Sequence, residues 1–310
     1  MKYAKWIALF LTFIVLCTLT ACKKEADFVS SESCFKVGIL YPDDPSKSAG
    51  KSAMHDAGIR RMCENLGLSE NQIIRKINVN DADKSATKAA ISACIESGAC
   101  IIFGTSAGYM EEMEIAANEN PDIIFSHYGK QTAALSNMNA YAPRFYEGGL
   151  LSGIAAGLKT EQNTIGFIFG TETEKDEIDA FTMGVKAVNP NAKIHLAAFG
   201  TESETAQITL GCDVLVQSCT VPVALPSAEV QGENKLSAVL NWGVYYTLCV
   251  KDVMEGRWSN VNYLGGINDG LITLSPLSES DGTIMETAQN MILNGELAVF
   301  EEKTPENKML

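Results

Sequence analysis

Short apolar runs alternate with amphipathic segments along nearly all of the chain after Phe35. The first unit is typical: a strand is predicted at residues 35–40, and the segment after it repeats apolar residues at helical spacing as far as Gly67. Parallel strands need a long crossover between them, usually a helix. The alternation therefore predicts an α/β fold with parallel sheets flanked by helices.

These strand and helix units fall into two series. The first has predicted strands at 35–40, 73–77, 99–103 and 122–126; the second has strands at 164–169, 194–199 and 213–217, a run ending near Trp242, and 271–274. Between them lies a stretch rich in alanine, serine and asparagine, residues 129–142, which we predict to be a loop. We therefore expect two Rossmann-like lobes, residues 35–139 with about 241–262 and residues 140–240 with about 263–310.

The helix expected at the start of the second series carries Gly149, Gly153 and Gly157 at intervals of four residues. Glycines repeated in this way lie on one face of a helix and allow a neighbouring element to approach closely. We expect that neighbour to be the sheet of the second lobe.

The N-terminus has the features of an export signal. Lys2 and Lys5 precede an apolar stretch at 6–19, which is short for a membrane span and runs into Leu-Thr-Ala-Cys at Cys22. This ending resembles the lipobox of bacterial lipoproteins. We expect cleavage after residue 21, lipidation of Cys22 and a polar tether at 22–34, so that the protein is anchored by lipid on the extracytoplasmic face of the cell membrane. The alternative is an ordinary secretory signal followed by an unrelated cysteine.

Composition excludes several classes of function. The chain has 24 basic and 38 acidic residues, and removal of the two signal lysines takes the net charge from −14 to −16. A nucleic-acid partner needs a basic surface, so none is expected. Seven cysteines remain after Cys22, an odd number that excludes a complete disulfide framework, and buried thiols such as Cys63 and Cys94 are expected instead. No metal-ligand spacing or nucleotide-binding motif occurs, so we expect no metal and no cofactor.

One motif suggests an enzyme. The stretch Gly-Thr-Ser-Ala-Gly places Ser106 between a predicted strand and a helix, as in the nucleophile elbow of serine hydrolases. A hydrolase also needs a later carboxylate and then a histidine. His127 follows Ser106 too closely for this order, and His195 falls within a predicted strand. We therefore expect no enzymatic activity, and instead a turn whose backbone N–H groups approach a ligand.

Several longer stretches resemble the basic membrane lipoprotein family of substrate-binding proteins, whose better known members bind purine nucleosides and supply an ABC permease. The stretches that carry the resemblance are residues 104–110, 144–153, 184–190, 213–215, 241–246 and 294–300. The resemblance implies a type I periplasmic-binding-protein fold, a small-molecule ligand held in a cleft at the strand ends, and ABC permease subunits as partners.

The resemblance also implies which residues line the cleft. A flat base is held by aromatic faces, and ribose hydroxyls are held by carboxylate or amide acceptors. The positions of this chain that match the family's strand-end loops are Asp43, Asp44, Ser52, Ser106, Tyr109, His127, Arg144 and Trp242. Trp242 has a second interpretation, as a core aromatic that supports the hinge.

Two departures from the family pattern weaken the nucleoside assignment, and a third concerns the second lobe. Lys51 stands where relatives have a base-stacking aromatic residue, and His127 stands where nucleoside binders have a ribose-binding aspartate. The stretch from Cys219 to Leu240 is short and has no helical period, so we expect a shortened second lobe. An alternative function is therefore a surface lipoprotein that keeps the fold but has lost transport. A serine hydrolase that uses Ser106 is a further alternative.

Overall fold

The computed structural model describes residues 35–47, 50–131, 134–170, 173–199, 211–218, 220, 235–275 and 282–294. The predicted signal, Cys22, the tether up to residue 34 and nearly all of the stretch between Cys219 and residue 234 lie outside this part. None of the helices in the described ranges is long and apolar enough to cross a membrane.

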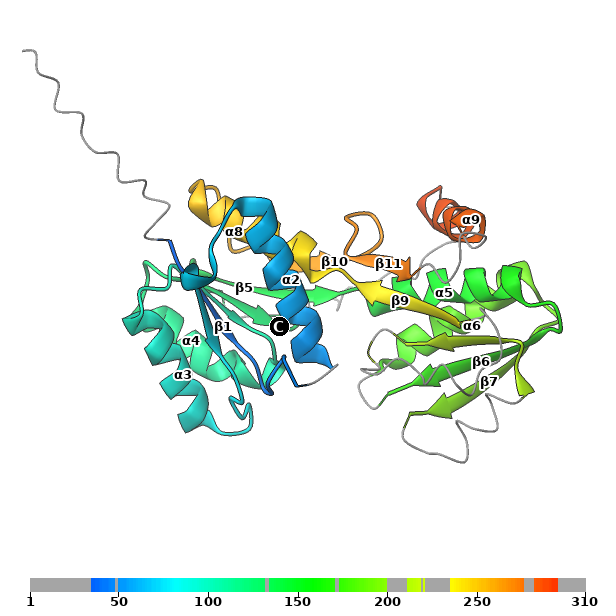
Figure 1. The fold of residues 1–310 in the computed structure, drawn as a ribbon, viewed down its shortest axis with the longest axis horizontal. Helices are drawn as coiled ribbons and strands as arrows, with labels where there is room; N and C mark the ends of the chain where they lie inside the picture. Colours follow the sequence, from blue (N-terminus) through cyan, green and yellow to red (C-terminus); the bar gives the residue numbers. More distant parts are fainter. Residues whose placement is uncertain are drawn as a thin grey trace, which may run out of the picture. The chain divides into compact units, whose positions relative to one another are not determined.

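The first sheet contains six parallel strands in the order β10-β5-β4-β3-β1-β2. Its central strands are apolar and fully buried because helices cover both faces, which is typical of parallel sheets. The helices α3 and α4 lie on one face, and α2 and α8 lie on the other (Figure 1). The strands are β1 (Val37–Leu40), β2 (Ile73–Lys76), β3 (Ile101–Gly104), β4 (Ile124–Tyr128), β5 (Met138–Pro143) and β10 (Tyr263–Gly265); the helices are α2 (Lys51–Leu66), α3 (Lys84–Glu96), α4 (Met110–Glu119) and α8 (Trp242–Met254), with short 3-10 turns η2 (Glu70–Gln72) and η3 (Ala107–Tyr109).

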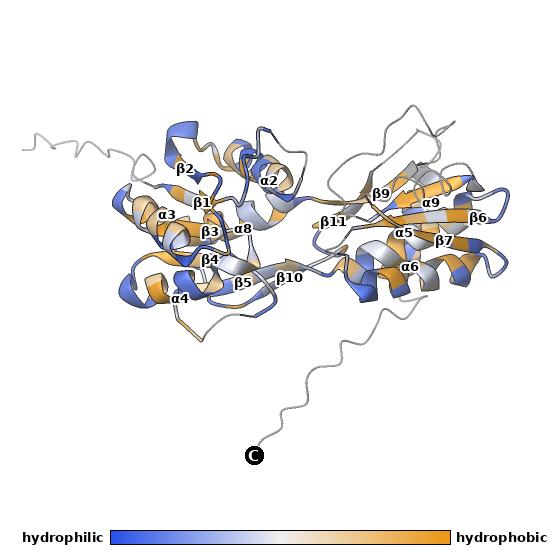
Figure 2. Cartoon of the chain, turned by 90° about the horizontal axis from the view of Figure 1, so that it is seen from below, coloured by the Kyte–Doolittle hydropathy of each residue, from blue (hydrophilic) through white to orange (hydrophobic). Residues whose placement is uncertain are grey.

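The second sheet contains five strands in the order β11-β9-β8-β6-β7. All of its pairs are parallel except that of β11 with β9. The apolar residues of β6 form an orange band in Figure 2 and are buried along most of the strand. The elements of this lobe are α5 (Phe145–Lys159), β6 (Thr164–Phe169), α6 (Lys175–Val188), β7 (Lys193–Ala198), β8 (Val214–Gln217), β9 (Lys235–Leu240), β11 (Ile272–Ser275) and α9 (Gly282–Leu293).

The chain passes between the two sheets three times. It leaves the first sheet after Pro143, returns after Leu240, and leaves again between Gly265 and Ile272. Sheet pairing thus places all of β5 and β10 in the first lobe, so the boundaries predicted at 139/140 and 262/263 lie a few residues too early. The stretch predicted as a loop, 129–142, ends in the buried strand β5.

The glycine repeat of α5 packs on a helix, not on the sheet as we expected. Gly149, Gly153 and Gly157 face α6, and Gly184 of α6 faces α5 in return. A Cβ atom on Gly157 would lie 2.6 Å from the side chain of Val188, and one on Gly153 would meet the carbonyl oxygen of Phe181 more closely still. Glycine is required here because the two helix backbones are almost in contact.

The five cysteines in the described ranges are free thiols. Cys63, Cys94 and Cys249 are buried in the first lobe, and Cys100 and Cys212 are partly exposed. Burial raises the pKa of Cys94 to about 11 and that of Cys249 to about 12. These side chains are therefore packing groups and not reactive thiolates.

Candidate functional site

The strand order of the first sheet fixes where a site can form. The connection from β1 leads to β2 on one side, whereas β3 lies on the other side of β1. In open parallel sheets, ligands bind outside the carboxyl ends of strands at such a switch point. The loops that follow β1 and β3 contain Asp43 and Ser106, and both residues were predicted as ligand contacts.

The loop after β1 is joined to the start of α2. Ser52 is buried, and its hydroxyl donates to the carboxylate of Asp43. Asp44 has another role: it accepts hydrogen bonds from the hydroxyl of Ser46 at 2.7 Å and from its backbone N–H at 3.0 Å, and it forms an ion pair with Lys47. These contacts lower the pKa of Asp44. Asp44 therefore stabilises its own turn, and Asp43 remains at the strand end.

The loop after β3 contacts the loop after β2. The hydroxyl of Ser106 donates to the carboxylate of Asp81. Gly108 lies against the same residue, because a Cβ atom there would be 2.7 Å from the carbonyl oxygen of Asp81. Ser106 is thus paired with a carboxylate, whereas His195, the histidine needed by a triad, is exposed on β7 of the other sheet. The described residues do not assemble the arrangement of a serine hydrolase.

We expect that a fluorophosphonate probe will leave the protein unlabelled. The hydroxyl of Ser106 has no adjacent histidine that could remove its proton, so it should be no more reactive than an ordinary serine. The check is mass spectrometry after incubation with the probe, with Ser106→Ala as the control and a known serine hydrolase as the positive reference. Covalent adduct on Ser106 of the unmodified chain would contradict the assignment.

Tyr109 connects the loop after β3 to the core of the first lobe. Its ring is fully buried in the core of the first lobe, and its hydroxyl donates to the carbonyl oxygen of Val79 at 2.7 Å. Burial, with the charges of Asp81 and Asp43, raises the pKa of Tyr109. Since both its ring and its hydroxyl are engaged within the core, we assign Tyr109 a structural role in place of the predicted ligand contact.

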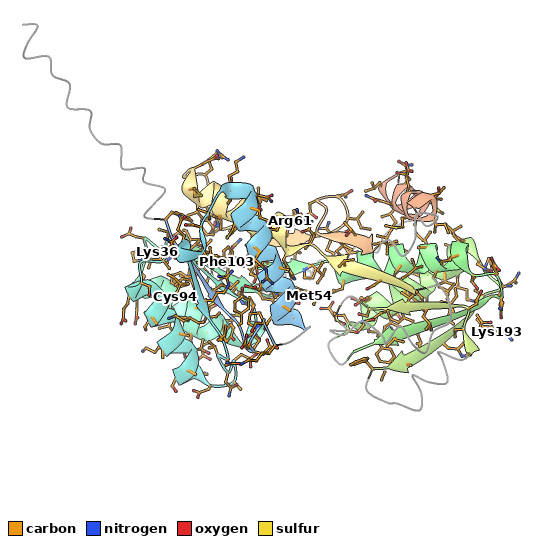
Figure 3. The ribbon with its side chains drawn as sticks, viewed as in Figure 1. Lys36, Met54, Arg61, Cys94, Phe103 and Lys193 are labelled. Atoms are coloured by element: carbon orange, nitrogen blue, oxygen red, sulfur yellow. The ribbon has the colours of Figure 1, made fainter. Side chains whose placement is uncertain are left out.

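A pocket lies beside the start of α2. Its apolar lining comes from Met54, labelled in Figure 3, together with Phe145 and Leu240. Lys51, Tyr128, Trp242 and Thr220 complete the described lining. The ammonium group of Lys51 lies over the ring of Tyr128, 4.1 Å from its centroid. The pocket therefore combines aromatic faces with one positive charge.

Trp242 forms one wall of this pocket and is also the largest fully buried side chain of the described residues. Its ring stacks on His55, with centroids 4.4 Å apart and an angle of 23° between the planes. Its indole N–H is buried and has no hydrogen-bond partner among the described residues. Trp242 therefore packs in the core, which is one of its two interpretations, and it also borders the pocket; its contact with a ligand stays a prediction.

A hydrogen-bond chain fixes His55 behind Trp242. Tyr141 donates to the carbonyl oxygen of Gly104, Tyr246 lies 3.2 Å from the hydroxyl of Tyr141, and His55 Nδ1 lies 2.7 Å from the hydroxyl of Tyr246. Phe103, labelled in Figure 3, packs edge-on against Tyr246. Burial, and then the charge of Lys51, lower the pKa of His55, so the imidazole is neutral at physiological pH.

His127 is the second-last residue of β4 and lies beside Gly104 of β3. Its Nε2 lies 3.0 Å from the carbonyl oxygen of Gln131 and must donate there, because a carbonyl oxygen only accepts. Nδ1 is then the unprotonated nitrogen; it is buried and has no partner among the described residues. Burial lowers the pKa of His127 and keeps the ring neutral. His127 thus has an unprotonated ring nitrogen near the end of β4.

Comparison with known proteins decides the family. A family model described as "Bmp: ABC transporter substrate-binding protein PnrA-like" matches residues 35–234. The chain belongs to this family. A purine-binding protein of Brucella abortus is 27% identical over 300 residues, covering 87% of this chain and 84% of that protein. A putative ABC transporter glucose-binding protein of Haloferax volcanii is 28% identical over 282 residues, covering 81% and 70% of the two chains.

Solved structures agree on the fold. An ABC transporter solute-binding protein of Conexibacter woesei has a TM-score of 0.70 at 18% identity, covering 86% of this chain and 98% of its own. One from Aeropyrum pernix has a TM-score of 0.63 at 15% identity, covering 87% and 94%. The Bmp chain therefore has the periplasmic-binding-protein fold with α/β lobes that the sequence predicted.

Arg144 follows the end of β5, and its described contacts are with other parts of the chain. Its backbone N–H donates to the carbonyl oxygen of Gly265 at 2.7 Å, and its guanidinium donates to the carbonyl oxygen of Leu264 and to the carboxylate of Glu147. The other oxygen of Glu147 accepts from the backbone N–H of Ile267 at 2.7 Å. Arg144 is thus occupied by the segments that cross between the lobes, and we assign it to the hinge of this Bmp protein.

Of the described pocket lining, only Trp242 was predicted from the sequence as a site residue, and Asp81 and His55 were not predicted either. Asp81 follows β2 and reaches Ser106 only because the two loops are in contact. Tyr128 ends β4 next to His127, so its position at a strand end could have identified it. His55 lies one turn before Ile59 and two turns before Met62 on the buried face of α2, and a histidine on an apolar face was a usable signal.

Proposed function

We propose that this protein is a lipid-anchored, extracytoplasmic solute-binding protein that captures a purine nucleoside or a related heteroaromatic compound for an ABC importer, without catalysis. The observation that carries the proposal is the aromatic pocket beside the switch point of the first sheet, in a chain of the Bmp family. Ligand capture by family members supplies a permease, and the membrane anchor follows from the sequence before Cys22.

The aromatic side chains of the pocket suit a flat ring better than an open chain or a lone sugar, and since the pocket encloses only about 30 Å³, its lining has to move apart to admit such a ring. Tyr128, Phe145 and Trp242 surround it, and aromatic side chains bind heteroaromatic bases by stacking and edge contacts. Such contacts are worth about 1–3 kcal/mol per base in other proteins. One relative of this chain is named as a purine-binding protein and another as a glucose-binding protein. The lining residues favour the first of these ligands.

Two acceptor groups could hold the hydroxyls of a ribose. The carboxylates of Asp43 and Asp81 each receive one serine hydroxyl, from Ser52 and Ser106, and a carboxylate can accept several hydrogen bonds. The unprotonated Nδ1 of His127 is a third acceptor at the same edge of the sheet. Acceptors that are already oriented by fixed neighbours would bind hydroxyls at low entropic cost.

A thermal-shift screen of the full-length chain in detergent tests the proposal. The probes are purine bases, nucleosides, riboflavin, glucose and ribose, and saturable stabilisation followed by calorimetric titration identifies a ligand. Stabilisation by bases or nucleosides at micromolar concentration supports the assignment. Stabilisation by glucose alone would show that the ligand is a sugar and not a heteroaromatic compound. No response to any probe would favour a surface lipoprotein that has lost transport.

Cys22→Ser is expected to abolish lipid anchoring. The acyl groups are added to the cysteine thiol, which serine lacks, and the signal peptidase of lipoproteins cuts only before the modified cysteine. The variant should keep its signal and run at a larger mass, or should leave the detergent phase after Triton X-114 partitioning. Ala21→Gly is the control, because a small residue before the cysteine is retained. A membrane-bound product of unchanged mature size from Cys22→Ser would rule out the lipobox.

A further inference from the structure

Lys51 is the one charged side chain among the described residues that line the aromatic pocket. It is the first residue of α2, and the first turn of this helix contains no acidic residue. The N-terminus of a helix carries a partial positive charge, so the ammonium group adds to a field that already favours hydrogen-bond acceptors. The carboxylate of Asp43, in the loop before α2, accepts from the hydroxyl of Ser52 in this turn.

The other polar groups of the lining also point to a ligand with acceptors. The indole N–H of Trp242 is a donor, is 99% buried and has no partner among the described residues. The hydroxyl of Thr220 lies 2.7 Å from that of Thr173 and 2.8 Å from that of Ser218. No carboxylate, amide or imidazole side chain is present in the described lining. A ligand that enters this pocket therefore meets two groups that only donate, the ammonium group of Lys51 and the indole N–H of Trp242, beside hydroxyls that donate or accept.

Purines differ in what they supply. A 6-oxopurine presents two neighbouring acceptors, O6 and N7, and lysine and arginine are the side chains that typically donate to this pair. A 6-aminopurine presents an N–H donor at position 6, and a donor cannot pair with an ammonium group. The acceptor at position 6 is thus the feature that a lysine in a purine pocket can distinguish.

We propose that Lys51 makes this site selective for 6-oxopurines, such as hypoxanthine and guanine and their nucleosides, over 6-aminopurines. The ammonium group, which lies over the ring of Tyr128 in this structure, donates to O6 and N7 of the bound base. The indole N–H of Trp242 donates to a further ring acceptor. The inference rests on the proposed function, because it presumes that a purine occupies the pocket.

Isothermal titration of the full-length chain in detergent with two matched pairs, hypoxanthine against adenine and inosine against adenosine, tests the inference. We expect the unmodified chain to bind the 6-oxo member of each pair at least about 10-fold more tightly. Lys51→Met should reduce the preference to within about 3-fold, and Lys51→Arg should keep it, because the guanidinium also donates to O6 and N7. Lys193→Met removes one charge from an exposed residue of β7, labelled in Figure 3, and should leave the preference unchanged.

The outcomes separate the inference from the proposed function. Equal or tighter binding of the 6-amino compounds by the unmodified chain overturns the inference but leaves purine binding intact. An undiminished preference in Lys51→Met also overturns it. If no purine or nucleoside binds, the proposed ligand class itself is wrong. Circular dichroism melts of each variant confirm that the compared chains are folded.

Discussion

Trp242→Ala is expected to lower the free energy of unfolding by about 3–5 kcal/mol, the usual cost of deleting a buried indole. The ring is 1% exposed, stacks on His55 at 4.4 Å, and meets Tyr141 edge-on at 5.5 Å. Gly58 of α2 lies against the same residue, since a Cβ atom there would be 2.5 Å from Cβ of Trp242. The substitution leaves a cavity at the contact between α2 and α8 that these rigid neighbours cannot fill.

Urea denaturation of the protein without ligand measures this effect. Trp258→Ala is the matched control: it removes the same side chain from a partly exposed position and should cost much less. Trp242→Phe separates packing from recognition, because it keeps an aromatic ring but removes the indole N–H. For hypoxanthine we expect an affinity roughly 2- to 10-fold lower in Trp242→Phe, the loss of one hydrogen bond. A Trp242→Ala protein as stable as the parent would show that the residue is not part of the core.

The strands were the most predictable part of this fold. Apolar runs buried on both faces leave a clear signal, and β6 was predicted with the bounds that the structure has, residues 164–169. The strand β5 was missed because its sequence, Met-Asn-Ala-Tyr-Ala-Pro, has few residues that favour strands. It is extended because it lies between β4 and β10, a tertiary effect that no local pattern encodes.

Three of the predicted site residues share one edge of the first sheet. Strand-end loops in a parallel sheet gave Asp43, Ser106 and His127, and the structure places all three at that edge. Which of these residues contact a ligand stays a prediction. The pairing of Ser106 with Asp81 could not be foreseen, since it joins loops that are 25 residues apart in the sequence.

Arg144 shows why a motif match does not assign a role. The stretch from Arg144 to Gly153 resembles the family. The guanidinium of Arg144 and the carboxylate of Glu147 nevertheless both bind backbone groups of the segment from Leu264 to Ile267. Charged groups in a strand-end loop are expected to contact ligand or solvent. Here they satisfy backbone groups where the chain crosses between lobes, and the sequence does not reveal that the two crossings are adjacent.

Glu147→Ala is expected to destabilise the protein by about 3–5 kcal/mol, the cost of removing one partner from a buried ion pair. The Glu147 side chain is 10% exposed and that of Arg144 is 22% exposed. The substitution leaves the guanidinium without its carboxylate and the backbone N–H of Ile267 without its acceptor. Gly266 fits closely against the same carboxylate, so no neighbouring side chain can take its place without a backbone shift.

Chemical denaturation of three variants tests this expectation. Glu111→Ala removes the acid of an exposed ion pair with Lys84 and should cost less than about 1 kcal/mol. Arg144→Leu combined with Glu147→Ala should be more stable than Glu147→Ala alone, because the double variant no longer buries an uncompensated charge. A loss in Glu147→Ala as small as that in Glu111→Ala would contradict the hinge assignment. Because both crossings meet at this pair, Glu147→Ala should also loosen the hinge, which hydrogen exchange of the amides at Gly265 to Ile267 would detect as faster exchange.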